Sequence, residues 1–416
     1  MKPPCSLPID REVILLENNE QFETVQEAAQ RLGVTVRAVQ KWAANGKIPG
    51  AVRFGRSWMI PKDTKLPEAD NVKPNGIPDV YQITPFRAAM PLMNSSYPVG
   101  GCLDYINGLP DPDDRNIALG EYYLFAGRCE EAAQITEPYL DSHDPSLRFS
   151  ASLICTFANL SRGHSHLARF AMNNLQEQVR RGLNSDAPKE FHAIGIFTAT
   201  TAAVLLHLPL PQIPPLEQYL KYLPGGMRMY GCYVLAHKAY LDGDYSRCLA
   251  FADAGMALSM EQYPISCIYS HIIAAVALMN MKKTKEAAQR LEDAWAIAQP
   301  DDLIQPFGEH HGLLQGLIEI YFKNNHPKDY ERIIAITYAF SATWRQIHNP
   351  DTNHDVADNL STMEFTIAML YTRGWSYKEI AGHLQISERS VSTRIADILA
   401  KTGVNNRNAL KKFMLK

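Results

Sequence analysis

The sequence predicts a mainly α-helical protein in which a helical-repeat body is flanked by a small helical head at each end. Three observations predict this fold class. A serine or threonine followed three residues later by glutamate precedes a short apolar-periodic segment at Thr24, Ser361 and Ser376, which is the spacing of an N-terminal helix cap. Between the heads, alanine-rich segments of helical periodicity alternate with short polar turns. Residues 51–61 alternate apolar and polar side chains, as a β hairpin does.

Residues 22–67 are predicted to form a head of two helices and a hairpin. The first helix begins after Thr24, and its apolar face consists of Val25, Ala28, Ala29 and Leu32. After a turn at residues 33–35, the second helix runs from about residue 36 to residue 44. It is expected to bury Val36, Val39 and Ala43. The Gly55-Arg56 step suits the tight turn of a hairpin wing.

This head resembles the excisionase or MerR-like winged helix-turn-helix. The resemblance rests on Val25-x-Glu27-Ala28-Ala29, Leu32-Gly33-Val34, Arg37-x-Val39-Gln40-x-Trp42, Gly46-Lys47-Ile48-Pro49-Gly50 and Gly55-Arg56-Ser57-Trp58-x-Ile60-Pro61. It implies that the second helix enters the major groove of DNA while the wing holds the neighbouring backbone. The DNA-contact candidates are Thr35, Arg37, Gln40, Lys41, Arg53 and Arg56. The alternative interpretation is a small protein-docking domain.

Residues 68–115 are predicted to be a proline-rich linker followed by a segment with little regular pattern. Pro74, Pro78 and Pro85 favour an extended tether, and a short helix is expected across residues 101–109. Residues 116–355 then form the helical body. Three of its stretches have the order helix, short polar turn, helix, at residues 118–133, 236–250 and 274–288.

The three stretches resemble tetratricopeptide repeats and the longer-period repeats of MalT-like regulators, because their spacing fits a period of about 39 residues. The resemblance implies stacked helical hairpins with a concave surface that can hold a peptide, a partner protein or a small effector. An irregular helical domain rich in alanine is the alternative.

Residues 356–416 are predicted to form a head of four helices. The first begins at the Ser361 and Glu364 capping box, and the second begins at the Ser376 and Glu379 box. Ser387 caps the third helix, and the fourth follows residues 405–407. The third helix is expected to bury Val391, Ile395, Ile398 and Leu399 and to leave small and basic side chains on its other face.

This head resembles the LuxR-type (NarL/FixJ-type) helix-turn-helix. The resemblance rests on Leu360-Ser361, Glu364, Gly374, Ser376, Lys378-Glu379-Ile380-Ala381, Leu384, Ile386-Ser387, Ser390-Val391, Lys401, Gly403-Val404 and Asn406-Arg407. It implies a regulator that binds DNA as a dimer, with Ser392, Thr393 and Ala396 facing bases. The full set of DNA-binding candidates is Ser387, Arg389, Ser390, Ser392, Thr393, Arg394, Ala396 and Lys401. The alternative is a small helical bundle that packs on a partner.

The distribution of charge favours nucleic acid at the two ends. Residues 22–67 contain eight Lys and Arg against three Asp and Glu, a net charge of +5, and residues 360–416 contain nine against four, also +5. The whole chain carries −3, so the remaining residues carry −13. Two basic heads beside an acidic body are expected when only the heads meet phosphates.

We expect no catalytic site, no cofactor and no metal site. The chain lacks a G-x-x-x-x-G-K-[ST] phosphate loop. Its two histidine clusters, at residues 164–166 and 309–311, lack the i, i+4 pairing of H-E-x-x-H, so surface or capping histidines are expected. The seven cysteines include no C-x-x-C pair and are expected to be reduced, partly buried thiols. No apolar run approaches the roughly 20 residues that span a bilayer, so we expect a cytoplasmic protein without membrane contact.

These expectations combine into a bacterial-type, sequence-specific transcription regulator that is not an enzyme. Double-stranded DNA is the expected partner, and a homodimer is the expected state on DNA. A small effector or protein in the groove of the body, and RNA polymerase, are further candidate partners. The competing hypothesis is a scaffold protein whose repeats recruit partners and whose heads dock proteins. Salt separates the two, because binding to phosphates weakens steeply with salt and apolar docking does not.

Overall fold

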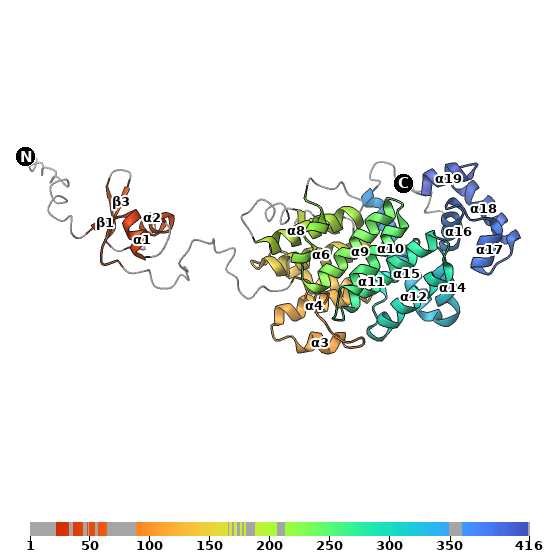
Figure 1. Cartoon of the computed structure of the whole chain (residues 1–416), viewed down its shortest axis with the longest axis horizontal. Coiled ribbons are helices and arrows are strands. Elements are labelled where there is room, and N and C mark those ends of the chain that lie inside the picture. The colour runs from red at the N-terminus through yellow and green to blue at the C-terminus, as the bar shows by residue number, and fades with distance from the viewer. Residues whose placement is uncertain are drawn as a thin grey trace, which may run out of the picture. The chain divides into compact units, whose positions relative to one another are not determined.

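The chain divides into two units, residues 1–86 and residues 87–416 (Figure 1). A computed structural model describes residues 22–32, 36–44, 48, 50–54, 57–64, 89–164, 166–168, 170–172, 175–176, 179, 188–205, 213–348 and 360–414. The predicted tether between the units lies largely outside the described residues. Within them, no helix combines the length and apolar character that crossing a membrane requires.

The first unit is a three-stranded sheet with two helices. Its elements are β1 (Phe22–Thr24), α1 (Val25–Leu32), α2 (Val36–Ala44), β2 (Val52–Phe54) and β3 (Ser57–Pro61). The strand order is β1-β3-β2 and both pairings are antiparallel, with Phe22 opposite Pro61 and Val52 opposite Met59. Strands β2 and β3 therefore form the predicted wing, and β1 adds a strand that we did not predict.

The core of this unit lies between the two helices and β3. Its buried residues are Val25, Ala28, Ala29, Val39, Trp42, Ala43, Ile48 and Ile60. The expected burial of Val36 is wrong, because this side chain is 38% exposed. The buried face of α2 consists instead of Val39, Trp42 and Ala43, and the first turn of the helix extends beyond it. Arg31 closes the unit, since its Nε donates to the Glu23 carboxylate at 2.9 Å and its Nη1 to the Thr64 carbonyl at 3.0 Å.

The second unit is built from α helices and 3-10 turns in its described residues. The elements of the body are α3 (Cys102–Gly108), α4 (Pro112–Phe125), α5 (Cys129–Thr136), η2 (Glu137–Tyr139), α6 (Pro145–Ser161), α8 (Lys189–Leu205), η3 (Leu216–Gln218), η4 (Leu220–Tyr222), α9 (Gly225–Leu241), α10 (Tyr245–Ala257), α11 (Pro264–Asn280), α12 (Thr284–Ala298), η5 (Gln299–Asp301), α13 (Gln305–Glu309), α14 (Leu317–Asn325) and α15 (Pro327–His348). Those of the C-terminal head are α16 (Thr362–Thr372), α17 (Tyr377–Leu384), α18 (Glu388–Lys401) and α19 (Arg407–Met414).

Three pairs of helices in the body form hairpins with turns of the same kind. Residues 126–128 join α4 to α5, residues 242–244 join α9 to α10, and residues 281–283 join α11 to α12. The middle residue of each turn has a left-handed backbone, with φ of +75° at Gly127, +77° at Gly243 and +59° at Lys282. Glycine adopts this conformation without the steric cost that other residues incur. Lys282 is therefore the exception among the three.

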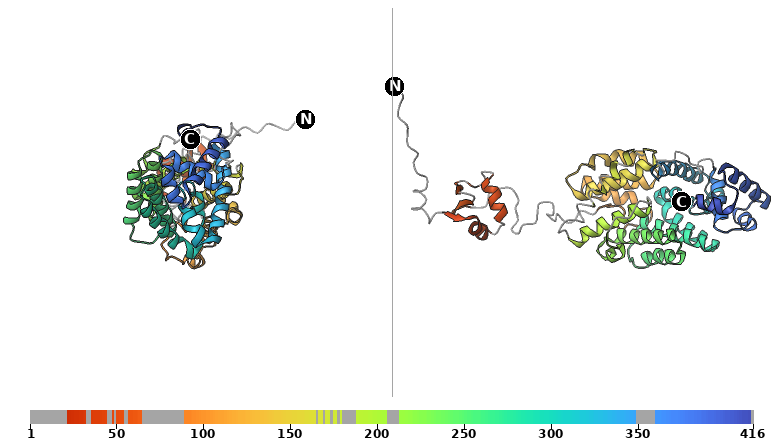
Figure 2. Two further views of the ribbon diagram at one scale, coloured as in Figure 1. Left: turned by 90° about the vertical axis from the view of Figure 1, so that its right-hand side faces the viewer. Right: turned by 90° about the horizontal axis from the view of Figure 1, so that it is seen from above.

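Helix α11 lies at the centre of the body. It packs against α9, α10 and α12, and nearly all of its residues are buried. A helix that is apolar on every side is expected in this position. Figure 2 shows the same hairpins from two further directions. The helix-turn-helix stretches that we predicted are thus hairpins, while their interpretation as tetratricopeptide-like repeats stays a prediction.

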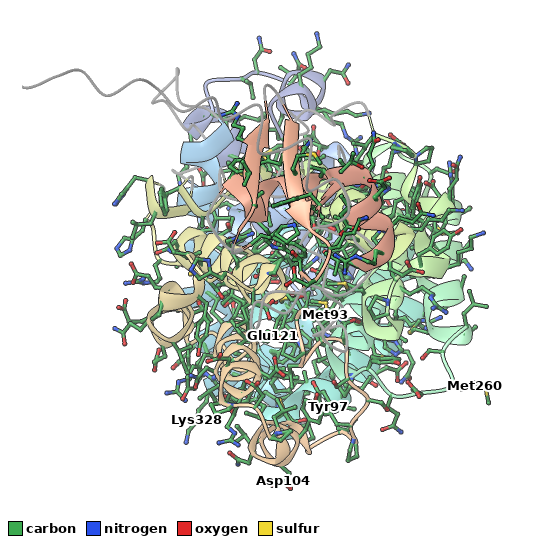
Figure 3. The ribbon with its side chains drawn as sticks, turned by 90° about the vertical axis from the view of Figure 1, so that its left-hand side faces the viewer. Met93, Tyr97, Asp104, Glu121, Met260 and Lys328 are labelled. Atoms are coloured by element: carbon green, nitrogen blue, oxygen red, sulfur yellow. The ribbon has the colours of Figure 1, made fainter. Side chains whose placement is uncertain are left out.

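A buried carboxylate holds the segment that leads into the body. The backbone N–H groups of Leu92 and Met93 donate to the two oxygens of Glu121, at 2.9 and 3.0 Å. Figure 3 labels Glu121 on α4 and the neighbouring Met93. Burial raises the pKa of Glu121 to about 8, although the two N–H donors oppose the shift. Side-chain acceptors, rather than secondary structure, therefore fix residues 89–94, where the sequence shows no regular pattern.

The expectation of surface or capping histidines is wrong for His310 and His311, which are both buried. Nε2 of His310 lies 2.9 Å from the Tyr233 hydroxyl, and Nε2 of His311 lies 2.9 Å from a carboxylate oxygen of Glu319. Burial lowers the pKa of His310 to about 4, so this imidazole is neutral at pH 7. These histidines satisfy polar groups inside the body, and no cluster that could hold a metal ion occurs in the described part of the chain.

The cysteines of the described residues are free thiols. Cys102, Cys129, Cys155, Cys232 and Cys248 are buried, and Cys267 is half-buried. Burial raises the pKa of Cys102, Cys129 and Cys248 to about 12. Because the thiolate is the reactive form of cysteine, these three side chains act as small apolar groups in the core.

Candidate nucleic-acid interface

Local capping sets where the helices of the C-terminal head begin. In the first box, the Ser361 N–H donates to Glu364 at 2.8 Å and the Glu364 N–H donates to the Ser361 hydroxyl at 3.3 Å. The Ser376 and Glu379 box has the same reciprocal bonds, at 2.7 and 3.2 Å. Ser387 accepts the N–H of Ser390 at 3.0 Å and so caps α18. All three predicted caps are confirmed.

A shared apolar core orients α17 and α18 as a helix-turn-helix. Ile380 and Leu384 of α17 and Val391, Ile395 and Ile398 of α18 are buried. Between the helices, Gln385 has a left-handed backbone with φ of +54°, and the N–H of Ile386 bonds back to the carbonyl of Ala381 at 3.1 Å. The turn is therefore fixed from both sides, so one face of α18 is committed to the core and the other is left outside.

The outer face of α18 carries most of the predicted DNA-binding residues. The side chains of Arg389, Ser392, Thr393, Arg394 and Ala396 are all exposed. They include two arginines and three small residues, which allow a helix to lie deep in a groove. The Thr393 hydroxyl donates to the carbonyl of Arg389 at 3.0 Å. The structure thus gathers these five residues on one open surface.

The remaining three candidates in this head make bonds within it. The hydroxyls of Ser387 and Ser390 lie 2.8 Å apart at the start of α18. Lys401 pairs with both oxygens of Glu364, at 2.7 and 2.8 Å, and so joins the end of α18 to the start of α16. Burial alone would raise the pKa of Glu364, but the hydrogen bonds from Lys401 and Ser361 lower it below its ordinary value.

The fourth helix is fastened to the first by Arg407. Its Nε donates to the carbonyl of Tyr371 at 2.6 Å, and its Nη2 donates to the carbonyl of Trp375 at 3.0 Å. The guanidinium carbon also lies 4.6 Å from the centre of the Tyr371 ring. Arg407 therefore satisfies the carbonyls at the end of α16 and in the loop before α17.

In the N-terminal head, the structure places only part of the predicted contact set. Gln40 and Lys41 are exposed on α2, and Arg53 is exposed on β2 of the wing. Arg37 lies in α2, and its side chain is outside the described residues. Thr35 and Arg56 are also outside them. The described members belong to the second helix and the wing, as the resemblance implies.

The body contacts the C-terminal head through residues that sequence reasoning did not identify. Arg373, directly after α16, donates from its guanidinium to the Asn280 carbonyl oxygen and the Tyr240 hydroxyl, and also to the Tyr245 hydroxyl at 3.3 Å. Its guanidinium carbon lies 5.4 Å from the centre of the Tyr240 ring. Tyr240 and Tyr245 flank the α9–α10 turn, and Asn280 ends α11. Arg373 thus binds the ends of two hairpins.

One face of α17 also rests on the body. Lys282, in the α11–α12 turn, places its Nζ 2.8 Å from Glu379 and 5.6 Å from the centre of the Trp375 ring. One helical turn later, Nε2 of His383 lies 3.0 Å from the carbonyl of Gln315. Residues 379 and 383 share a face because they are four apart in a helix. The head (blue) lies beside one end of the body in Figures 1 and 2.

Two glycines allow the close approach of residues 312–316 to the head. A Cβ at Gly312 would lie 2.7 Å from the Phe365 ring, and one at Gly316 would lie 2.6 Å from Leu384. Gly316 also has a left-handed backbone with φ of +90°. Phe365 and Leu384 belong to α16 and α17, so both helices of the head meet the body without intervening side chains.

Comparison with known proteins identifies both heads. Residues 24–64 match the family model described as a helix-turn-helix domain, and residues 358–414 match the model described as bacterial regulatory proteins, luxR family. No curated protein and no solved structure matches the chain. The two matches confirm the recognition of the heads and support a DNA-binding transcription regulator. Neither match extends into residues 65–357.

Proposed function

We propose that this protein is a sequence-specific transcription regulator that reads DNA bases through α18. The observation that carries the proposal is the outer face of α18, which is polar and basic and is exposed on a helix buried only on its other side. In a helix-turn-helix, the second helix lies in the major groove and its N-terminal half meets base edges. Arg389, Ser392 and Thr393 occupy that half.

The side chains suggest how the contacts divide. Arginine pairs with the O6 and N7 acceptors of guanine or with phosphates, and serine and threonine bond to either type of base edge. Arg389 and Arg394 are therefore the candidates for the strongest contacts. Ser392, Thr393 and Ala396 provide a low surface against the base edges. Ser387 and Ser390 lie at the start of α18, where backbone N–H groups and hydroxyls meet phosphates.

The N-terminal head supplies a second DNA contact in this proposal. Gln40 and Lys41 of α2, together with Arg37, would face the major groove, and Arg53 and Arg56 of the wing would face the neighbouring backbone. Two small heads on one chain increase affinity by raising the effective concentration of the second head once the first is bound. A homodimer would double the number of heads on a site with two-fold symmetry.

The helical body is proposed to sense a signal and to pass it to the C-terminal head. Direct packing of hairpin ends on α16 and α17 supports this role, because a change in the body then reaches the head without a linker. A small effector, a peptide or a protein partner such as RNA polymerase would bind the body, which is the part of the chain outside both family matches.

The test is selection of a random double-stranded DNA library by the full-length protein at near-physiological salt, followed by sequencing. Recovery of a motif is expected. The doubly substituted Arg389→Ala and Arg394→Ala protein should bind that motif at least severalfold more weakly, since a good arginine contact to a base discriminates by about 1–3 kcal/mol. The matched control removes two arginines of the body, Arg128→Ala and Arg332→Ala, and should bind as the unmodified chain does.

Two results would count against the proposal. Unchanged binding by a folded Arg389→Ala and Arg394→Ala protein would exclude α18 as the reading helix. A library that shows no enrichment, together with partner binding that is insensitive to salt, would favour the scaffold hypothesis, in which the heads dock proteins.

A further inference from the structure

Lys282 occupies a backbone conformation that the equivalent turns give to glycine. Its φ is +59°, against +75° at Gly127 and +77° at Gly243. A residue with a Cβ costs roughly 1–2 kcal/mol more in this region than in the right-handed one. Such strain is retained where the side chain has a role. The side chain of Lys282 is the one that reaches the C-terminal head.

The contacts of Lys282 lie at the start of α17. Its Nζ is 2.8 Å from a carboxylate oxygen of Glu379 and 3.5 Å from the carbonyl of Gly374. The hydrogen bond from Lys282, followed by that from Ser376, lowers the pKa of Glu379 to about 2. Glu379 is the acidic member of a capping box, and Lys282 balances its charge at this end of the helix.

The start of α17 is also where DNA is expected to pass. In a helix-turn-helix, the first helix crosses the phosphate backbone while the second lies in the groove, and the N-terminus of a helix favours an anion. A lone Glu379 would repel a phosphate there. The lysine of the body removes that repulsion, so the body takes part in shaping the surface that the backbone would meet.

Two more lysines follow directly in the same turn and helix. Lys283 and Lys285 are both exposed, and Lys283 makes a 3.3 Å pair with Glu286, in which the side chains are 45% and 60% exposed. A surface pair of this kind contributes little to stability, so Lys283 can turn to another anion at low cost. Arg373 and Lys282 hold the turn against the head, which keeps both lysines beside α17.

We infer that the α11–α12 turn of the body is a DNA-backbone contact site, in which Lys283 and Lys285 bind phosphates of the duplex that α18 reads and Lys282 positions the turn against α17. The inference rests on the proposed function of the C-terminal head. The ligand class is the phosphodiester backbone, so the site adds affinity without adding sequence preference.

The experiment compares the salt dependence of DNA binding by full-length proteins on the selected motif and on a scrambled duplex. The doubly substituted Lys283→Gln and Lys285→Gln protein keeps Lys282 and therefore the docked head. Each lost phosphate contact lowers the slope of log affinity against log salt by about 0.9. The slope of this variant should therefore fall by up to about 2. Its affinity should decrease by a similar factor on both duplexes, and its preference for the motif should be unchanged.

The matched control removes two exposed lysines at the other end of the body, Lys189→Gln and Lys221→Gln. Lys189 begins α8, and Lys221 lies in η4, which precedes α9, whereas Tyr240 at the far end of α9 meets the head. The control should retain the slope of the unmodified chain.

The outcomes separate this inference from the proposed function. An unmodified chain that selects a motif, combined with an unchanged slope for Lys283→Gln and Lys285→Gln, would overturn the contact site and leave the proposed function standing. An equal fall in the control would also overturn it, because the effect would then come from net charge. An unmodified chain that binds no DNA would overturn both.

Discussion

Replacing Arg373 with alanine is expected to release the C-terminal head from the body without unfolding the head. The side chain bonds to Tyr240, Tyr245 and Asn280, all of which belong to the body. The apolar core of the head, formed around Ile380, Val391 and Ile395, does not depend on these bonds. The loss should therefore appear at the ends of the hairpins.

The size of the effect follows from the number of bonds. A hydrogen bond to a charged group contributes about 1.5–3 kcal/mol, and two of the three bonds of Arg373 are close, the third being 3.3 Å long. Because the guanidinium is only partly buried, we take the lower limit for each close bond, which gives about 3 kcal/mol. This loss would lower the docking equilibrium constant roughly 150-fold.

Amide hydrogen exchange followed by mass spectrometry measures this directly. In the Arg373→Ala protein, exchange should accelerate in peptides that cover residues 239–246, 279–284 and 312–318, and protection of α18 should persist. The control is Arg407→Ala, since Arg407 bonds to the Tyr371 and Trp375 carbonyls within the head. That variant should loosen α19 and leave the hairpin ends protected. Unchanged exchange at the hairpin ends of a folded Arg373→Ala protein would refute the reasoning.

Three further changes probe other parts of the second unit. Gly316→Ala should also undock the head, because its backbone is left-handed and a Cβ would lie 2.6 Å from Leu384; normal exchange rates at residues 312–318 would contradict this. Lys282→Gly should unfold at higher urea than Lys282→Ala, by about 1 kcal/mol, because both lose the side chain but glycine removes the left-handed strain; equal midpoints would contradict it. Glu309 has its pKa raised by burial to about 7 from the ordinary 4.5, so the native state holds a proton that the unfolded chain has released, and the unfolding free energy should fall as pH rises from 4.5 to about 7. Urea unfolding across this pH range should show a weaker decline for Glu309→Gln, and identical declines would exclude Glu309 as a source.

Local signals in the sequence were sufficient for the architecture of the heads. Each capping box needs two residues three positions apart, and the buried face of α18 repeats at helical spacing, so both could be read from short windows. Strand β1 was missed because three residues, Phe22 to Thr24, are too few to show alternation. Val36 was assigned to the core by the same periodicity, which cannot show where the neighbouring elements end.

The contacts between body and head could not be predicted, because they join residues far apart in the chain. Arg373 meets Tyr240 across 133 positions and Asn280 across 93, and no periodicity links such pairs. The burial of His310 and His311 has the same origin, since Tyr233 and Glu319 belong to other helices. In the candidate interface, the exposed face of α18 followed from its pattern, whereas the part played by Lys282 required the fold.

Helix α9 can act mechanically as a lever between two fixed points. At its first turn, the N–H of Met227 bonds to Asn94, and a Cβ at Gly226 would collide with the carbonyl of Met93, so this end is a tight pivot. At its last turn, Tyr240 holds Arg373 of the head. A helix of 17 residues is about 25 Å long, and a tilt of about 5° around the pivot would displace its tip by roughly 2 Å. Rearrangement of residues 89–97 would therefore be felt as movement of the DNA-reading end, with no need for α9 itself to bend.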